Sequence, residues 1–160
     1  TTGNGLVSDF TAEGLQKFGI PTLEDVFQLV SDQCEINIEI KTYDTTQGVL
    51  GLMEQHPDWK NRVVISSFDW NILQEVRFHD NEIRLGVLTE TDLDSAFAFA
   101  KFIRAYSIHP DFHLLTAENT NKLQKAGFLV FPWTVNDPED IIFVKSLRVD
   151  GIITDYPDRI

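Results

Sequence analysis

The sequence predicts an α/β fold built on a parallel sheet, because two hydrophobic periods alternate along it. Short runs rich in β-branched residues are separated by amphipathic stretches with helical spacing. The repeat is roughly 20–26 residues, about what a strand, a helix and short loops need. Repeated units of this kind imply a parallel sheet covered by helices. The six predicted strands occupy about residues 36–41, 62–67, 84–88, 103–108, 128–134 and 149–154.

The predicted helices have recognisable start signals. Thr22 is the expected N-cap of the first, with Asp25 three residues on, as in a capping box. Later helices are predicted to start after Asp69, Asp92 and Thr116, and at Asn136-Asp137-Pro138, where proline occupies the first turn. In each, apolar residues follow at helical spacing.

Two architectures fit repeated strand–helix units: a doubly wound open sheet and a (β/α)8 barrel. The doubly wound sheet that binds nucleotides carries a glycine-rich loop after its first strand, and the sequence has none. The barrel instead predicts functional residues at the carboxyl ends of several strands. Strands covered on both faces should be rich in Val and Ile, as residues 63–65 are.

Composition narrows the class of protein further. The 160 residues suffice for one domain, expected to span residues 1–160, and 42% of them are hydrophobic. No run approaches the ~20 apolar residues of a transmembrane helix, so a soluble chain is expected. The net charge of -12 argues against a nucleic-acid partner. No leader pattern starts at Thr1, and the single Cys34 excludes an internal disulfide. A cytoplasmic, periplasmic or secreted location and the oligomeric state stay open.

The first predicted strand carries the strongest functional signal. Asn37, Glu39 and Lys41 share one face of it, and isoleucines occupy the other. The surrounding pattern suggests that both faces of this strand are covered, and a carboxylate and an amine are costly there unless they are paired or bind a ligand. Glu39 could simply pair with Lys41. Alternatively, Glu39 binds a hard cation such as Mg²⁺ or Ca²⁺, and Lys41 neutralises phosphate oxygens.

Other polar or aromatic residues follow the predicted strands, where an α/β sheet binds its ligands. His109 is either a packed loop residue or a substrate-binding one, and Trp133 is either a core residue or a ligand wall. Asp155 could instead cap a turn, and Phe68 is expected to combine packing with a pocket wall. The full set is Glu39, Lys41, Ser66, Ser67, Phe68, Ser107, His109, Trp133, Thr134, Asn136, Thr154 and Asp155.

Five segments, in order and spread over nearly the whole chain, resemble the glycerophosphodiester phosphodiesterase family. They are Ile20-Pro21-Thr22-Leu23-Glu24-Asp25-Val26, Asn37-Ile38-Glu39-Ile40-Lys41, Val64-Ile65-Ser66-Ser67-Phe68, Pro132-Trp133-Thr134-Val135-Asn136 and Val149-Asp150-Gly151-Ile152-Ile153-Thr154-Asp155-Tyr156-Pro157-Asp158. The resemblance implies a (β/α)8 barrel to which this chain contributes about six units, strands 3 to 8. It also implies metal-dependent hydrolysis of a small glycerophosphodiester to glycerol 3-phosphate and an alcohol.

The resemblance assigns roles by position. Glu39 resembles the family's third carboxylate metal ligand, for Mg²⁺ or Ca²⁺, and Lys41 the lysine that contacts the substrate phosphate, so both are candidate catalytic residues. Trp133 resembles the aromatic wall beside the glycerol moiety, and Phe68 falls on the family's Ser-Phe strand end. Together with Lys41 and His109, these are the candidate substrate-binding residues.

The chain lacks the motifs of the family's first two strands: a His-Arg pair, a Glu-x-Asp metal pair and a second histidine. Residues 1–5 resemble the turn that follows that histidine. We therefore expect an ordered fragment of a longer enzyme, inactive by itself. Two alternatives are a phospholipase D-like lyase of the same barrel group and a non-catalytic binding protein with a decayed site.

Overall fold

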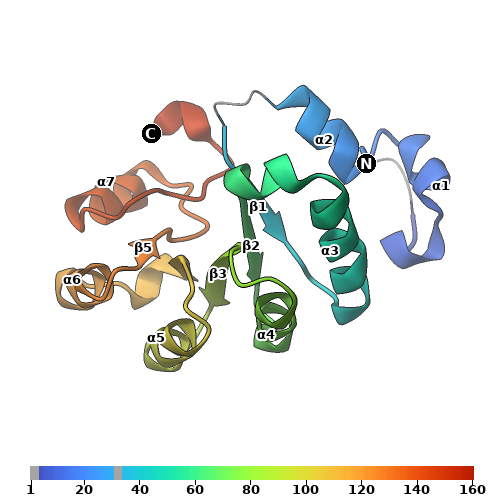
Figure 1. Ribbon diagram of the computed structural model, residues 1–160. Helices are drawn as coiled ribbons and strands as arrows, with labels where there is room; N and C mark the ends of the chain where they lie inside the picture. The colour runs from blue at the N-terminus through green and yellow to red at the C-terminus, as the bar shows by residue number, and fades with distance from the viewer. Residues whose placement is uncertain (1–3, 31–33) are drawn as a thin grey trace. The chain divides into compact units, whose positions relative to one another are not determined.

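The computed structural model describes residues 4–30 and 34–160. The chain divides into two compact units, Thr1–Glu35 and Ile36–Ile160 (Figure 1). The predicted turn at residues 1–5 lies largely outside the described residues. The prediction of one domain over residues 1–160 stays a prediction.

In residues 4–30, the described part of the first unit up to α2, there are three short helical segments, η1 (Val7–Asp9), α1 (Ala12–Gln16) and α2 (Leu23–Leu29). The predicted capping box at α2 is confirmed. The Thr22 amide donates to Asp25 Oδ2 at 2.8 Å, and the Asp25 amide donates to Thr22 Oγ1 at 3.2 Å. Phe27 of the predicted apolar stripe is buried. Local hydrogen bonding therefore fixes where this helix begins.

The second unit contains a parallel sheet of five strands in consecutive order, β1-β2-β3-β4-β5 (Figure 1). A doubly wound sheet reverses its strand order at a switch point, whereas a barrel keeps the order of the chain. The consecutive strand order therefore favours a section of a (β/α)8 barrel over a doubly wound sheet. The strands are β1 (Ile36–Glu39), β2 (Val63–Ser67), β3 (Arg84–Thr89), β4 (Ser107–Pro110) and β5 (Leu129–Val130).

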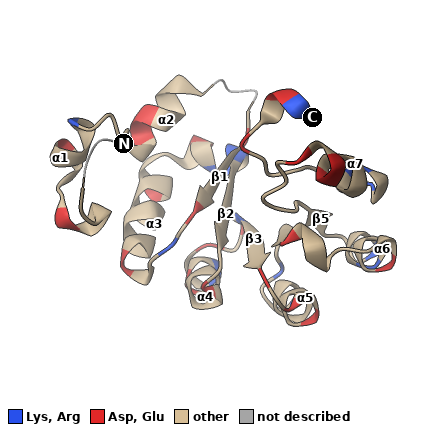
Figure 2. Cartoon of the chain, turned by 180° about the vertical axis from the view of Figure 1, so that it is seen from behind, with Lys and Arg blue, Asp and Glu red and all other residues tan. Residues whose placement is uncertain are grey.

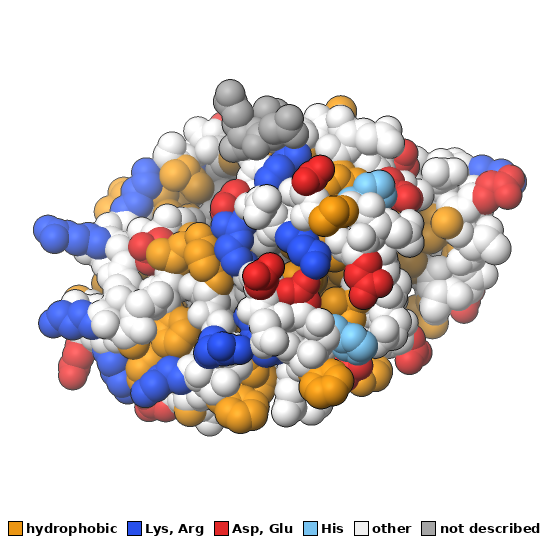
Figure 3. All heavy atoms as spheres, viewed as in Figure 1, with side chains coloured by type: hydrophobic (Ala, Val, Ile, Leu, Met, Phe, Trp, Pro, Cys, Tyr) orange, Lys and Arg blue, Asp and Glu red, His pale blue; other side chains and the backbone are white. Residues whose placement is uncertain are grey.

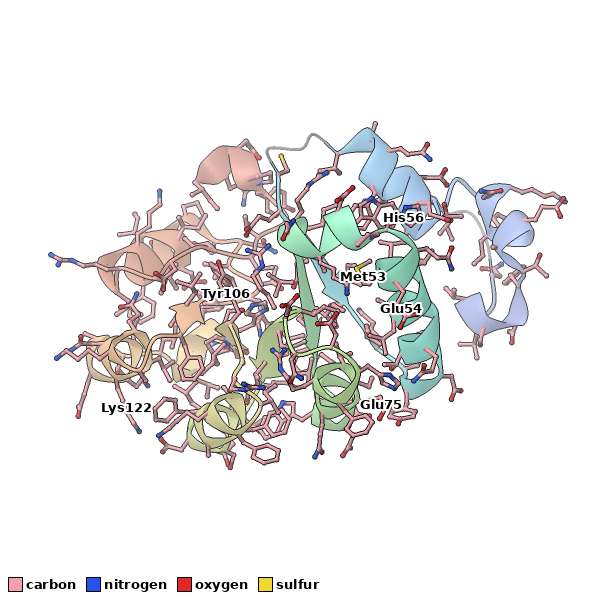
Figure 4. The ribbon with its side chains drawn as sticks, viewed as in Figure 1. Met53, Glu54, His56, Glu75, Tyr106 and Lys122 are labelled. Carbon is pink, nitrogen blue, oxygen red and sulfur yellow. The ribbon has the colours of Figure 1, made fainter. Side chains whose placement is uncertain are left out.

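Helices connect successive strands and follow one another around the outside of the sheet (Figure 1). Right-handed crossovers that always advance to the next strand place their helices on one face. In α3, Met53 is fully buried and its neighbour Glu54 is exposed (Figure 4). The helices are α3 (Thr46–Gln55), α4 (Trp70–His79), α5 (Leu93–Phe102), α6 (Ala117–Lys125) and α7 (Pro138–Ser146), and the 3-10 turns are η2 (Tyr43–Thr45), η3 (Pro57–Arg62), η4 (Phe112–Leu114) and η5 (Pro157–Arg159).

The helix starts predicted in this unit are confirmed. Asp69, Asp92, Thr116 and Asp137 each cap a helix with a side-chain oxygen that accepts a backbone N–H. Charged residues lie mainly on these helices and on loops (Figure 2). On the face shown in Figure 3, acidic and basic side chains are interspersed. No helix in the described parts of the chain is both long and apolar enough to cross a bilayer.

The prediction of six strands is wrong in number, because residues 149–154 form no strand in the structure. They run beside the segment after β5 as extended chain. The Asp150 amide donates to Val130 O at 3.1 Å, and the Ile153 amide to Pro132 O at 2.9 Å. β5 itself has only two residues, although the Phe131 and Trp133 amides beyond it still donate to Ile108 O and Pro110 O of β4, each at 3.1 Å. The sixth predicted segment thus lies beside the fifth, as expected, but it does not form a regular strand.

The fourth strand begins later than predicted. The sequence places it at residues 103–108, but α5 continues to Phe102 and the strand covers Ser107–Pro110. Between them Arg104 adopts a left-handed conformation with φ 54°. Ile103 in this turn is buried, and its hydrophobic character made the predicted strand start too early. One consequence is that His109 lies within the strand and not in a loop.

Candidate active site

The register of the strands aligns three of the predicted polar residues, Glu39, Ser66 and Ser107, in one row across the sheet. Glu39 pairs with Ser66, Ser66 with Gly86, and Gly86 with Ser107, so these four residues form one row. Because side chains alternate along strands, the row shares a face with residues two positions on, such as His109. The carboxyl ends of parallel strands meet at one edge, where α/β folds bind ligands.

The polar face of β1 is open, which corrects the prediction that both faces of this strand are covered. Asn37, Glu39 and Lys41 are exposed, whereas Ile38 and Ile40 are buried on the helix-covered side. β1 is the edge strand of a five-stranded sheet, and no described strand pairs beyond it. The cost of burying a charge is therefore no argument that this triplet forms a functional site. Its position at the carboxyl end of β1 remains an argument for one.

Glu39 and Lys41 form an ion pair, as the simpler interpretation of the sequence expected. Lys41 Nζ lies 3.7 Å from Glu39 Oε1, with the two side chains 76% and 34% exposed. Exposed pairs of this kind contribute about 0–1 kcal/mol, because water competes and both side chains lose freedom. Lys41 can therefore turn toward an anion at little cost. The pair does not exclude a site.

An open hollow of about 310 Å³ lies beside this pair. Ser67 holds two of its walls together: its hydroxyl donates to Ile40 O at 2.6 Å and accepts from the Asp69 amide at 3.1 Å. The sequence identified Asp69 only as a helix cap and missed it as a lining residue. Its position directly after the Ser-Phe strand end could have shown this. The lining residues are Glu39, Ile40, Lys41, Ser67, Phe68 and Asp69.

The two predicted aromatic residues come together. The Phe68 and Trp133 rings meet edge to face with centroids 5.2 Å apart, and Phe68 stays 47% exposed. The Trp133 indole N–H donates to the His109 carbonyl at 2.8 Å, which fixes the orientation of the ring. Segments 65 residues apart in the chain thus form one partly exposed aromatic wall.

His109 is buried, with only 2% of its surface exposed. Its Nε2 lies 2.8 Å from Ser107 Oγ, and its ring packs against Phe131 with centroids 5.4 Å apart. Burial lowers the pKa of His109 from 6.5 to about 4, so the ring is neutral near pH 7. Its side chain is not among those that line the hollow. His109 contacts the candidate site through its backbone carbonyl, which accepts the hydrogen bond from the Trp133 indole.

The histidine ring occupies the space above Gly86. A Cβ added at Gly86 would lie 2.6 Å from His109 Cε1 and 2.7 Å from Nε2. We therefore expect Gly86→Ala to destabilise the fold by about 1–3 kcal/mol, the usual cost of overpacking. Thermal denaturation of the variant tests this. The matched control is Gly48→Ala in α3, where an added Cβ meets nothing within 4 Å and stability should hold or rise.

A second variant shows whether His109 is the cause. In Gly86→Ala/His109→Ala the clash is gone, so the double variant should lose less stability than the two single losses added together. Additive losses would contradict the packing explanation.

Asn136, Thr154 and Asp155 form a structural network. Asn136 Oδ1 accepts from Thr154 Oγ1 at 3.1 Å and from the Asp155 amide at 2.9 Å, while Asn136 Nδ2 donates to Asp155 Oδ2 at 2.8 Å. These bonds tie the loop before α7 to the chain before η5. The interpretation of Asp155 as a turn residue is the one that these contacts support.

The described residues do not complete a metal site. No group of three or more His, Cys, Asp or Glu side chains in residues 4–30 and 34–160 is arranged to hold an ion. Glu39 and Asp69 are the carboxylates of the hollow, and Mg²⁺ or Ca²⁺ prefers six or more oxygens. Glu39 fits as one ligand, not as a whole site.

The consecutive parallel sheet, with acidic, basic and aromatic groups at its carboxyl edge, defines a section of an α/β barrel with a candidate site at that edge. The chain belongs to the glycerophosphoryl diester phosphodiesterase family, whose family description matches residues 1–159. It is 34% identical over 178 residues to a glycerophosphodiester phosphodiesterase of Caldanaerobacter subterraneus, with 100% of this chain and 73% of that protein covered. The predicted family is thereby confirmed.

Solved structures agree with the fold. The glycerophosphodiester phosphodiesterase of Thermotoga maritima is 30% identical and superposes with a TM-score of 0.77, covering 93% of this chain and 67% of its own. An Oleispira antarctica phosphodiesterase, solved with its product sn-glycerol-3-phosphate, has a TM-score of 0.70 at 19% identity and covers 78% and 53%. This second likeness shows the fold alone. This chain spans only 48% of the length of a third solved structure, a glycerophosphoryl diester phosphodiesterase-like protein from Silicibacter pomeroyi.

Proposed function

We propose that the whole protein hydrolyses glycerophosphodiesters to glycerol 3-phosphate and an alcohol. The observation that carries this proposal is the Glu39–Lys41 pair at the carboxyl end of β1, beside an open hollow, in a chain of this family. The names of the relatives from Caldanaerobacter and Thermotoga support the same activity.

In this proposal Lys41 is the phosphate contact. Its ammonium is exposed and only weakly held by Glu39, so it can approach a phosphodiester and offset charge on the non-bridging oxygens. Phe68 and Trp133 form the wall beside the glycerol moiety. His109 contributes to substrate binding through its carbonyl, which holds the Trp133 indole.

Family members generally use a divalent metal, which polarises the phosphodiester when bound. We propose Glu39 as one carboxylate ligand for Mg²⁺ or Ca²⁺, with the remaining ligands and the general acid and base outside the described residues. The open geometry around Glu39 supports this, because the residue lines an accessible hollow.

Product analysis tests the activity. The full-length protein is incubated with glycerophosphocholine in the presence of Mg²⁺, of Ca²⁺ or of a chelator, and the products are identified by phosphorus NMR. Glycerol 3-phosphate that forms only with metal is the expected result. The same incubations are repeated with a lysophospholipid, and a cyclic phosphate formed from it would favour the phospholipase D-like lyase. Calorimetric binding without any product would favour a binding protein with a decayed site.

A further inference from the structure

Two buried polar atoms on the inner face of the sheet have no hydrogen-bond partner in the described structure: Ser66 Oγ and His109 Nδ1. Ser66 is 0% exposed and His109 2%. Leaving a buried donor or acceptor unpaired costs about 1–3 kcal/mol, so native proteins rarely tolerate it without ordered water. Two such atoms on one face of the sheet are a stronger sign than either alone.

The strand register brings these two atoms to the same place. Ser66 is the partner of Gly86 in β3, and Gly86 is the partner of Ser107 in β4. A Cβ at Gly86 would lie 3.2 Å from His109 Nδ1, so this nitrogen lies over the glycine. Neighbouring strands are about 4.8 Å apart, which places the Ser66 hydroxyl roughly one bridging molecule away from the ring.

Gly86 leaves the necessary space between them. Any larger residue there would fill the region above β3, where both register partners of the glycine, Ser66 and Ser107, carry only hydroxyls. A serine hydroxyl and a neutral imidazole nitrogen can each act as hydrogen-bond donor or acceptor. A small ligand that can both donate and accept would therefore satisfy both atoms. Water meets this requirement, and two or more polar partners are what a buried water needs.

We infer that Ser66, Gly86 and His109 form a buried site for a single water molecule that bridges Ser66 Oγ and His109 Nδ1. The result is a hydrogen-bonded chain from Ser107 through the imidazole and the water to Ser66, across three strands. It ends next to Glu39, the register partner of Ser66 in β1. The inference concerns packing and hydrogen bonding, and it does not rest on the proposed activity.

The test uses the full-length protein and two independent measurements. A crystal structure that resolves ordered waters should show one oxygen within hydrogen-bond distance of both atoms. Nitrogen NMR of the imidazole should show His109 Nδ1 in a hydrogen bond in the wild type. A direct contact between Ser66 and His109 with no water, or a dry gap between them, would overturn the inference.

Variants assign the NMR signal. Ser66→Ala removes one partner of the water and should shift the Nδ1 resonance more than that of Nε2, which Ser107 holds. The matched control is Ser67→Ala, because the Ser67 hydroxyl bonds Ile40 O on the opposite side of β2 and should leave Nδ1 unchanged. An unchanged Nδ1 resonance in Ser66→Ala would refute the bridging role. The wild-type crystal structure decides the matter should this variant fail to fold.

Discussion

Glu39→Ala is expected to abolish metal-dependent hydrolysis of glycerophosphocholine by the full-length protein, with a loss of kcat of ~10²-fold or more, the scale of losing one preorganised electrostatic group. The carboxylate is at the end of β1 beside Lys41, in the lining of the hollow. In the proposed function this carboxylate holds the metal that polarises the phosphodiester, so the loss should appear in kcat. Steady-state kinetics over a range of Mg²⁺ and Ca²⁺ concentrations measures it.

Two controls separate a site effect from a folding effect. Glu39→Gln keeps the size of the side chain and removes its charge, so it should lose activity with little change in Tm. Glu54→Ala alters an exposed glutamate of α3 outside the hollow and should retain activity (Figure 4). Near-normal turnover in both Glu39 variants would refute the assignment of this carboxylate to the site.

The stability of the protein is expected to fall as the pH is lowered from 6.5 to 4, and His109 is one cause. The pKa of its buried imidazole is lowered from 6.5 to about 4, so the unfolded chain takes up a proton that the folded chain resists. The stabilising contribution is therefore complete above pH 6.5 and disappears by about pH 4. At 1.36 kcal/mol per pKa unit, it amounts to roughly 3 kcal/mol.

Urea denaturation at several pH values measures this contribution. Carboxylates also titrate in this range, so the informative quantity is the difference between the wild type and His109→Gln. The variant should be less stable at pH 7 but lose less stability on acidification. His113→Gln, at an exposed histidine that pairs with Asp111, should keep the wild-type pH dependence assigned to His109. Parallel curves for the wild type and His109→Gln would show that burial of the ring is not the cause.

Local signals in the sequence predicted the helices well. The cap at Thr22, and those at Asp69, Asp92, Thr116 and Asp137, depend on hydrogen bonds within three residues. Strand ends were predicted less well. The boundary at Ser107 depends on the left-handed turn at Arg104, and regular pairing ends at Val130 although the Phe131 and Trp133 amides still bond β4. Apolar runs do not record such contacts, because turn and strand residues are equally hydrophobic there.

Some features of the candidate site were likewise predictable from the sequence, and others were not. The sequence by itself identified the family, the α/β class and the Glu39–Lys41 pair, because these reside in short motifs and in the two hydrophobic periods. The tertiary structure alone decided that the polar face of β1 is open, that Asp69 joins the hollow, and that His109 is buried over Gly86. The physical reason is that burial and contact depend on strand register and edge position, which bring together residues far apart in the chain.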